Sequence, residues 1–430
     1  MTDSFERNAA VLQNRWPDVF ARLLAEDDAL LEVELVEGLQ STLSISGIQL
    51  TSRHDRIAEA RLQAASLPQA SKVLHLYGTG LGDLQRVLLE EHSAARLQVH
   101  ILNGALFALV LKLTDQDDWL SDPRIELGYA ADRPEIQLPF FALPAELELA
   151  DENNARIRDR LVSEVHIHFN NREFDPQAPQ ILQRLEESFD LVSRDPDVAE
   201  LFGSQSGREI YVIGTGPSLE QHFEKLLAVR GQPQRPLFVC VDTAYQPLIA
   251  QGIRPDLVVT IDQRICDRHL PAADSAGIRL VYLPLSDPQV LSAWQGERYV
   301  GFSPSPVYAQ LRQRVQRGIL AAGGSVIHPA VDLAVKMGAA QITLFGVDFA
   351  YPMNKSHAGW GDGELGAPVD QARQWVLDGH GRRVKTLLNF RRYLGELERY
   401  IQAHPKVRFF NSSRSGAMIA GTAFNAEFSQ

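Results

Sequence analysis

The chain has 430 residues, of which 45% are hydrophobic and 22% charged, so it has the composition of an ordinary globular protein and the length of two or three domains. Its formal net charge of −12 argues against nucleic acid as the main partner, and its two cysteines are too few for a disulfide framework or a zinc site. It has no apolar run near the ~20 residues needed to span a bilayer and no secretion signal, so we expect a cytoplasmic protein that does not insert into membranes.

The alternation of apolar strands and amphipathic helices predicts an α/β protein. We predict a smaller N-terminal α/β domain at 1–165, of Rossmann-like type, and a helical connector at 166–207. A catalytic domain at 208–430 follows, with a Rossmann-like parallel sheet and C-terminal helices. The predicted helices of the first domain lie within 1–30 and at 57–67 and 105–113, and its predicted strands lie within 32–52 and near 73–77, 97–102, 125–128 and 136–138.

The first domain contains a glycine turn between a strand and a helix, with Gly78, Gly80 and Gly82. The spacing resembles that of a methyltransferase loop that binds S-adenosylmethionine. Such a site usually has an acidic residue at the end of the next strand, where this chain has Asn103. A structural or degenerate loop is therefore the favoured interpretation, and S-adenosylmethionine binding is the alternative.

The second domain repeats the strand and helix pattern several times. Short helices are expected at 247–252 and 330–337, and the C-terminal part is expected to be helical at 372–377 and 386–401. The arginines of the last helix, which include Arg391, are expected to be exposed to solvent. A late strand at 407–410 precedes the hydroxyl-rich segment 411–416, for which a surface loop is favoured over a loop that closes on a ligand. The predicted strands of this domain lie at 210–213, 237–242, 256–262, 279–283, 298–302 and 341–348.

A second glycine turn follows the first strand of this domain, and it is the strongest single motif of the chain. Two glycines let a backbone approach a ligand closely, and the amides that begin the next helix favour an anion. The motif lacks the third glycine of the dinucleotide fingerprint and the Lys-Ser/Thr ending of a Walker loop. The turn consists of Gly214, Thr215, Gly216, Pro217 and Ser218.

Polar side chains follow several strands of the second domain at their carboxyl ends. In open α/β sheets, ligands bind at that edge. Together with the glycine turn, these side chains predict a site for a nucleotide or a sugar nucleotide. They are Asp242, Thr243, Thr260, Asp262, Ser303 and Asp348, and His328 begins a nearby helix.

Four segments resemble the motility accessory factor (Maf) family: 213–219, 241–244, 252–262 and 344–351. Members of that family are glycosyltransferases implicated in flagellin glycosylation and motility. The resemblance therefore implies that this protein transfers a sugar to serine or threonine of flagellin. The family shares its central domain with archaeal hydroxymethylpterin pyrophosphokinases, which supply the main competing activity.

The central domain also resembles bacterial sialyltransferases that use CMP-activated nine-carbon acidic sugars. The resemblance implies a CMP-nonulosonic acid donor, pseudaminic or legionaminic acid or a relative, with no metal or other cofactor required. The glycine turn, with Asp242, Thr243, Thr260, Asp262, Ser303 and His328, would bind this donor.

By the same resemblance, Asp348 and Tyr351 belong to the catalytic segment that precedes a mobile lid at 353–363. In that lid, His357 is the candidate base for the acceptor hydroxyl, with His328 as its rival. Tyr351, with Lys355 near it, would neutralise the departing phosphate.

Two alternatives remain open. In a pyrophosphokinase, Asp242 and Asp262 would bind Mg²⁺, and ATP would be the substrate. In a non-catalytic accessory protein, the site would be vestigial and flagellin would only be bound. The sequence specifies neither the sugar, the acceptor residues nor the oligomeric state.

Overall fold

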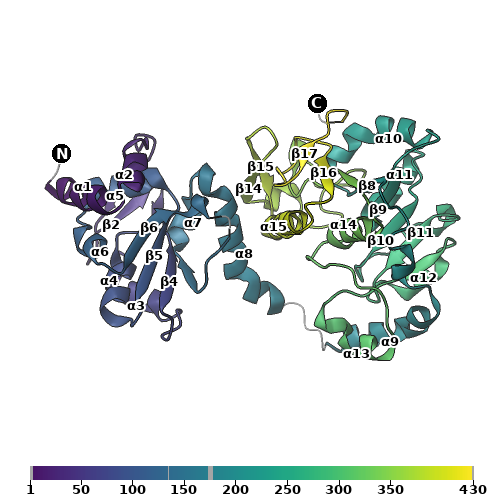
Figure 1. The fold of residues 1–430 in the computed structure, drawn as a ribbon, viewed down its shortest axis with the longest axis horizontal. Coiled ribbons are helices and arrows are strands. Elements are labelled where there is room, and N and C mark those ends of the chain that lie inside the picture. The colour runs from purple at the N-terminus through teal and green to yellow at the C-terminus, as the bar shows by residue number, and fades with distance from the viewer. Residues whose placement is uncertain (1–2, 134, 173–177, 429–430) are drawn as a thin grey trace. The chain divides into compact units, whose positions relative to one another are not determined.

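The computed structural model describes residues 3–133, 135–172 and 178–428 (Figure 1). Contacts between backbone positions divide the chain into two compact units, Met1–His166 and Ile167–Gln430. Each unit has its own hydrophobic core and its own parallel sheet. The predicted α/β fold with parallel sheets is thus confirmed. Among the described residues, no helix is both long and apolar enough to cross a membrane.

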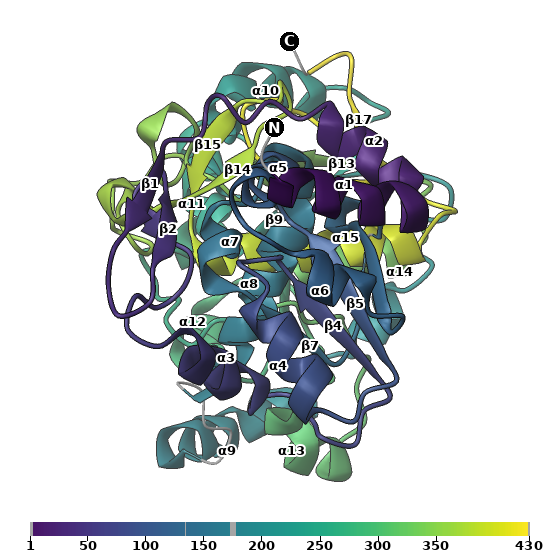
Figure 2. The same ribbon diagram turned by 90° about the vertical axis from the view of Figure 1, so that its left-hand side faces the viewer.

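The first unit contains a four-stranded parallel sheet with the strand order β6-β5-β4-β7. A separate antiparallel sheet, β1-β2-β3, precedes it, and β1 and β2 lie side by side in Figure 2. The strands of this unit are β1 (Val33–Val36), β2 (Thr42–Ile45), β3 (Ile48–Gln49), β4 (Val73–Tyr77), β5 (Arg96–Ile101), β6 (Ile125–Tyr129) and β7 (Phe140–Ala142).

The helices of the first unit follow the apolar spacing of the sequence, with a break at Pro17, which begins the second helix. They are α1 (Asp3–Arg15), α2 (Pro17–Leu24), α3 (Arg56–Ala64), α4 (Asp83–Glu91), α5 (Gly104–Leu113), α6 (Asp117–Ser121) and α7 (Pro144–Glu148), with short 3-10 helices η1 (Ala130–Asp132) and η2 (Glu152–Asn154). The boundary between the units falls within α8 (Ala155–Arg172). The strand predicted at 136–138 is wrong: the chain pairs with β4 only from Phe140, after Pro139.

The second unit is built on an eight-stranded parallel sheet with the order β12-β11-β10-β9-β8-β13-β16-β17. Strands β9 to β12 lie on one side of β8, and β13 lies on its other side, so the strand order reverses between β8 and β13. The strands are β8 (Glu209–Ile213), β9 (Leu237–Val241), β10 (Leu257–Thr260), β11 (Arg279–Tyr282), β12 (Arg298–Val300), β13 (Gln341–Phe345), β16 (Arg408–Asn411) and β17 (Ala423–Phe424), with a separate hairpin of β14 (Gln374–Leu377) and β15 (Arg383–Thr386).

Helices cover this sheet; α14 packs against β8 and β9, and α11 packs against β9 and β10. The helices are α9 (Pro179–Arg194), α10 (Phe223–Arg230), α11 (Asp242–Ala250), α12 (Pro288–Ala293), α13 (Ala309–Arg314), α14 (Ile327–Lys336) and α15 (Leu388–Ala403). Short 3-10 helices complete the unit: η3 (Val198–Leu201), η4 (Pro217–His222), η5 (Ala272–Asp274), η6 (Pro306–Tyr308), η7 (Pro352–Asn354) and η8 (Val369–Gln371).

Three expectations for the second unit are wrong. Residues 372–377, expected to be helical, contain strand β14, because they pair with β15 in a hairpin. The side chain of Arg391, expected in solvent, is buried and donates hydrogen bonds to the carbonyl oxygen of Trp375. The segment 411–416 is not a plain surface loop, since Ser412 and Ser413 are buried.

Candidate functional site

A cavity of about 120 Å³, open to solvent, lies at the carboxyl ends of β8, β9 and β13. Its position is where the strand order of the sheet reverses, which is the usual ligand position in open α/β sheets. Its walls come from the loops after β8 and β13, the first turn of α11, the N-terminus of α14, helix α15 and the segment before Gly359. The predicted site residues that line it are Gly214, Thr215, Gly216, Thr243, Asp348 and His357.

The glycine turn after β8 packs against the loop after β13. The amide of Gly214 donates to the carbonyl oxygen of Phe345 at 2.8 Å, and the amide of Gly216 donates to that of Gly346 at 2.7 Å. A Cβ atom on Gly214 would lie 2.7 Å from the Gly346 oxygen, closer than van der Waals contact allows. The two glycines therefore permit a close backbone approach, as expected, but the approaching group is the chain itself.

Asp348 lies beneath this turn and is buried. The Ser218 amide donates to one of its carboxyl oxygens at 2.8 Å, and the Ser218 hydroxyl donates to the other. Burial raises the pKa of Asp348 to about 6, although both hydrogen bonds favour the charged form. Ser218, which belongs to the turn expected to bind the donor, does not line the cavity, and its hydroxyl is bonded to Asp348.

The acidic residues at the strand ends differ from one another in their surroundings. Asp242 begins α11 and is buried, and its burial raises its pKa to about 7. Asp262 forms an ion pair with Arg264. Burial raises the pKa of Asp262, but the hydrogen bonds from Arg264 outweigh burial and hold this pKa below the usual value for an aspartate. Neither residue lines the cavity, and neither do Thr260 and Ser303.

The two candidate bases are clearly distinguished. His357 lines the cavity, and its Nδ1 atom is buried with no hydrogen-bond partner among the described residues. Burial lowers the pKa of His357 to about 4, and the nearby charge of Asp362 acts in the opposite direction. His328 instead lies with its ring nitrogens 3.0 Å from the carbonyl oxygens of Ser325 and Tyr393, and it does not line the cavity. The histidine that faces the cavity is therefore His357.

The two groups expected to neutralise a phosphate have other partners. The Tyr351 hydroxyl is buried and donates to the carbonyl oxygen of Ala367 at 2.9 Å. The Lys355 ammonium forms an ion pair with Glu220. Neither side chain lines the cavity, so the structure does not place them on a departing phosphate.

Sequence reasoning missed part of the cavity wall. Ser325 and Val326 precede α14, and their amides lie at the positively polarised end of that helix. Phe390 and Tyr393 are three residues apart on α15, a spacing that places them on one face of the helix. Ser356 is buried, and its hydroxyl has no partner among the described residues. The turn Gly323-Gly324-Ser325 before a helix was the only sequence signal for any of them.

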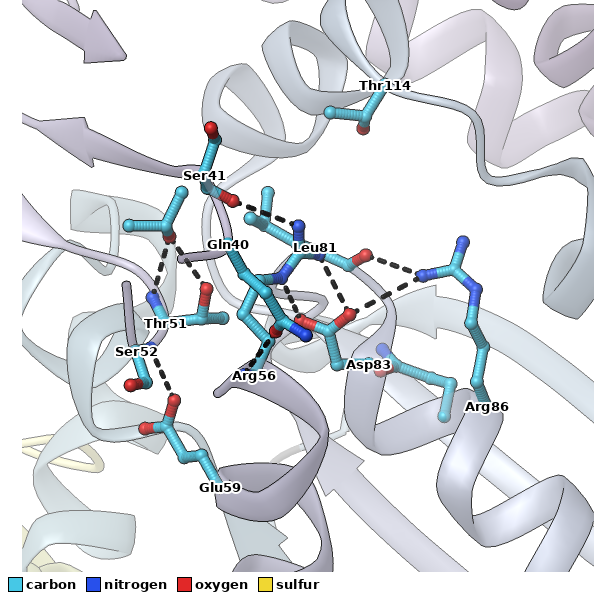
Figure 3. Close-up of polar contacts among 12 residues, drawn as sticks. Gln40, Ser41, Thr51, Ser52, Arg56, Glu59, Leu81, Asp83, Arg86 and Thr114 are labelled. Atoms are coloured by element: carbon cyan, nitrogen blue, oxygen red, sulfur yellow. Dashed lines mark hydrogen bonds and ion pairs between the residues drawn. The ribbon is translucent and has the colours of Figure 1, made fainter. Parts of the chain in front are cut away.

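The glycine turn of the first unit is occupied by a side chain of that unit. The carboxylate of Glu146, on α7, accepts hydrogen bonds from the amides of Thr79 and Gly80. Arg56 forms two hydrogen bonds with Asp83, the first residue of α4 (Figure 3). Glu146 thus takes the position that an anionic ligand would need, which agrees with a structural role for this turn.

Within the described ranges, no group of three or more histidine, cysteine, aspartate or glutamate side chains could hold a metal ion. Both cysteines are free thiols.

Comparisons with known proteins address the second unit most directly. Residues 183–354 match the family model described as MptE-like, 6-hydroxymethylpterin diphosphokinase MptE-like. This confirms the predicted similarity of the region to hydroxymethylpterin pyrophosphokinases. Among solved structures, the chain is similar to the MAf glycosyltransferase from Magnetospirillum magneticum AMB-1, with 17% identity, a TM-score of 0.47 and coverage of 99% of this chain and 74% of that chain. The search among curated proteins gave no match.

Proposed function

We propose that this protein, which contains an MptE-like domain at residues 183–354, is a glycosyltransferase that moves a nonulosonic acid from a CMP-sugar to serine or threonine of flagellin. The donor would be a CMP-activated pseudaminic or legionaminic acid or a relative. The proposal includes no metal or other cofactor.

The observation that carries the proposal is the place of His357 in the cavity. The α14 N-terminus forms one wall and is of the kind that accommodates a nucleotide phosphate, while the glycine turn, whose Gly214, Gly216 and Ser218 amides donate to the chain itself, forms another wall. His357 lies in the same cavity, and burial lowers its pKa to about 4, so its imidazole is uncharged at pH 7 and open to a proton, although it is a weaker base than an ordinary histidine. A nucleotide donor and an acceptor hydroxyl would therefore meet beside an available base.

In the proposed reaction, the oxygen of the acceptor hydroxyl forms a bond to the anomeric carbon of the sugar. The bond between that carbon and the phosphate oxygen breaks, and CMP leaves with the electron pair. His357 takes the hydroxyl proton. The positively polarised N-terminus of α14, which lines the cavity, would stabilise the negative charge on the leaving phosphate, because neither Tyr351 nor Lys355 lines the cavity.

The second candidate is a pyrophosphokinase, favoured by the description of the matching family model. In that reaction the enzyme would transfer a diphosphate from ATP to a pterin hydroxyl and release AMP. Asp242 and Asp262 would be the nearest acidic groups for Mg²⁺, but Asp242 is buried and Asp262 is engaged with Arg264. We therefore prefer the sugar transfer.

Thermal unfolding with CMP, ATP or GTP, each with and without EDTA, separates the candidates, because a ligand of the folded state raises the melting temperature. Sugar transfer predicts stabilisation by CMP that survives EDTA. It also predicts CMP release from CMP-pseudaminic or CMP-legionaminic acid when flagellin is present. His357→Gln should retain the stabilisation by CMP and lose the transfer. Stabilisation by ATP only with Mg²⁺ would support the pyrophosphokinase, and flagellin binding without turnover would support the accessory protein.

A further inference from the structure

The segment that carries His357 is attached to the glycine turn and its surroundings at several points. The amide of Ala358 donates to the carbonyl oxygen of Thr215, in the turn itself, at 2.8 Å. The indole nitrogen of Trp360 donates to the carbonyl oxygen of Thr243, in the first turn of α11, at 2.9 Å. These contacts hold the chain immediately after His357.

Gly359 brings the segment close to α11. It has a φ of +72°, in the left-handed region that favours glycine, and a Cβ atom there would lie 2.8 Å from the ring of Pro247. The backbone of Gly359 therefore packs against α11 more closely than a residue with a side chain could. The amide of Gly359 donates a hydrogen bond to Oε1 of Glu220 at 2.8 Å.

Glu220 holds the segment on both sides of His357. Its Oε1 atom accepts from the Gly359 amide, two residues after His357, and from the Lys355 ammonium, two residues before it. Glu220 lies on η4, the short helix that directly continues the glycine turn. One carboxylate thus joins the turn that would hold the donor to the segment that carries the candidate base.

We infer that Glu220 is a positioning residue, which holds the 355–359 segment so that His357 faces the cavity. Glu220 itself does not line the cavity and acts through the backbone of Gly359 and the side chain of Lys355. The ion pair with Lys355 is about one third exposed on each side and is therefore a weak constraint. The charge-assisted hydrogen bond to the Gly359 amide is the more important contact.

Removal of Glu220 has two expected effects. A slower chemical step is expected only under the proposed function, whereas a looser 355–359 segment is expected whatever the protein does. Without Glu220, the segment loses its attachment at Gly359 and opens more often. The donor site, built from the loops after β8 and β13 and from α14, is left intact. Donor binding should therefore change little, while the chemical step, which depends on the position of His357, should slow.

Hydrogen exchange followed by mass spectrometry tests the structural part on the full chain. In Glu220→Ala we expect the amides of residues 358–360 to exchange about tenfold faster, with unchanged exchange in β8 and β13. Glu220→Gln keeps an oxygen for the Gly359 amide and should restore most of the protection. Glu224→Ala is the matched control, because Glu224 is exposed and lies one helical turn further on. Unchanged exchange at 358–360 in Glu220→Ala would overturn the inference.

Kinetics with a CMP-nonulosonic acid and flagellin test the catalytic part. We expect Glu220→Ala to lower kcat about tenfold and to leave KM for the donor within about twofold, with Glu220→Gln between this variant and the wild type. An unchanged kcat would overturn the positioning role. If the wild type shows no turnover, the proposed function fails, while faster exchange in Glu220→Ala would still confirm the attachment.

Discussion

The hydroxyl and the amide of Ser218 both donate hydrogen bonds to the carboxylate of Asp348, which lies 130 residues further along the chain. The two residues belong to the loops after β8 and β13, the neighbouring strands at which the order of the sheet reverses. Their contact joins the two loops that form the floor of the cavity. A buried carboxylate of the same chain therefore helps to fix the end of the glycine turn.

Ser218→Ala should destabilise the second unit by about 1–3 kcal/mol, because it leaves a buried carboxyl oxygen of Asp348 without a donor. Chemical denaturation followed by tryptophan fluorescence measures this change. Ser286→Ala is the control, since the buried Ser286 hydroxyl has no hydrogen-bond partner among the described residues. The control should be neutral or slightly stabilising, and equal effects of the two substitutions would contradict the prediction.

Asp348→Asn should flatten the dependence of stability on pH. The pKa of Asp348 is raised to about 6 in the folded protein, so the folded state binds this proton more tightly than the unfolded state. The resulting stability is present below about pH 4 and is lost as the pH rises through 6. The free energy of unfolding of the wild type, relative to that of the variant, should therefore fall between pH 4 and pH 7. A difference that is independent of pH would rule out this titration.

Gly416→Ala should disturb the same carboxylate. A Cβ atom at Gly416 would lie 2.5 Å from a carboxyl oxygen of Asp348 and 2.7 Å from its Cα atom, so the chain would have to move. We expect a loss of about 1–3 kcal/mol, the usual cost of forcing extra atoms into a packed core. Gly395→Ala, in α15 with no atom near the added Cβ, should instead stabilise by about 0.5–1 kcal/mol. Calorimetric melting of both variants gives the comparison.

In the first unit, Glu146→Ala should loosen the glycine turn, because the amides of Thr79 and Gly80 lose their acceptor. Hydrogen exchange at 79–82 should rise, and Glu146→Gln, which keeps one oxygen, should show a smaller rise. Glu148→Ala is the control on the same helix, where the side chain is exposed. S-adenosylmethionine should not stabilise the wild type, and a clear rise in melting temperature with this ligand would contradict a structural turn.

Local patterns were sufficient to predict most strands of both parallel sheets, although not β7 and β17, and the edge at which the cavity lies. The strand, glycine turn and helix at Gly78 and at Gly214 were predicted because apolar periodicity and glycine spacing act over a few residues. Parallel pairing then follows from the alternation of strands and helices, and with it the common edge of the strand ends. The helical expectation at 372–377 failed because β14 depends on a partner strand, and apolar spacing alone does not show one.

The tertiary structure alone decided which polar groups face the cavity and which are occupied inside the protein. Ser218 meets Asp348, Glu146 meets Thr79 and Gly80, and Lys355 meets Glu220 across separations of 66 to 135 residues. Two groups form a hydrogen bond only if the fold brings them within about 3 Å of each other. The residue types in a sequence do not specify which distant groups the fold brings together. The amino-acid sequence by itself therefore determined the framework and the location of the cavity, while packing between distant segments determined which side chains are free to act in it.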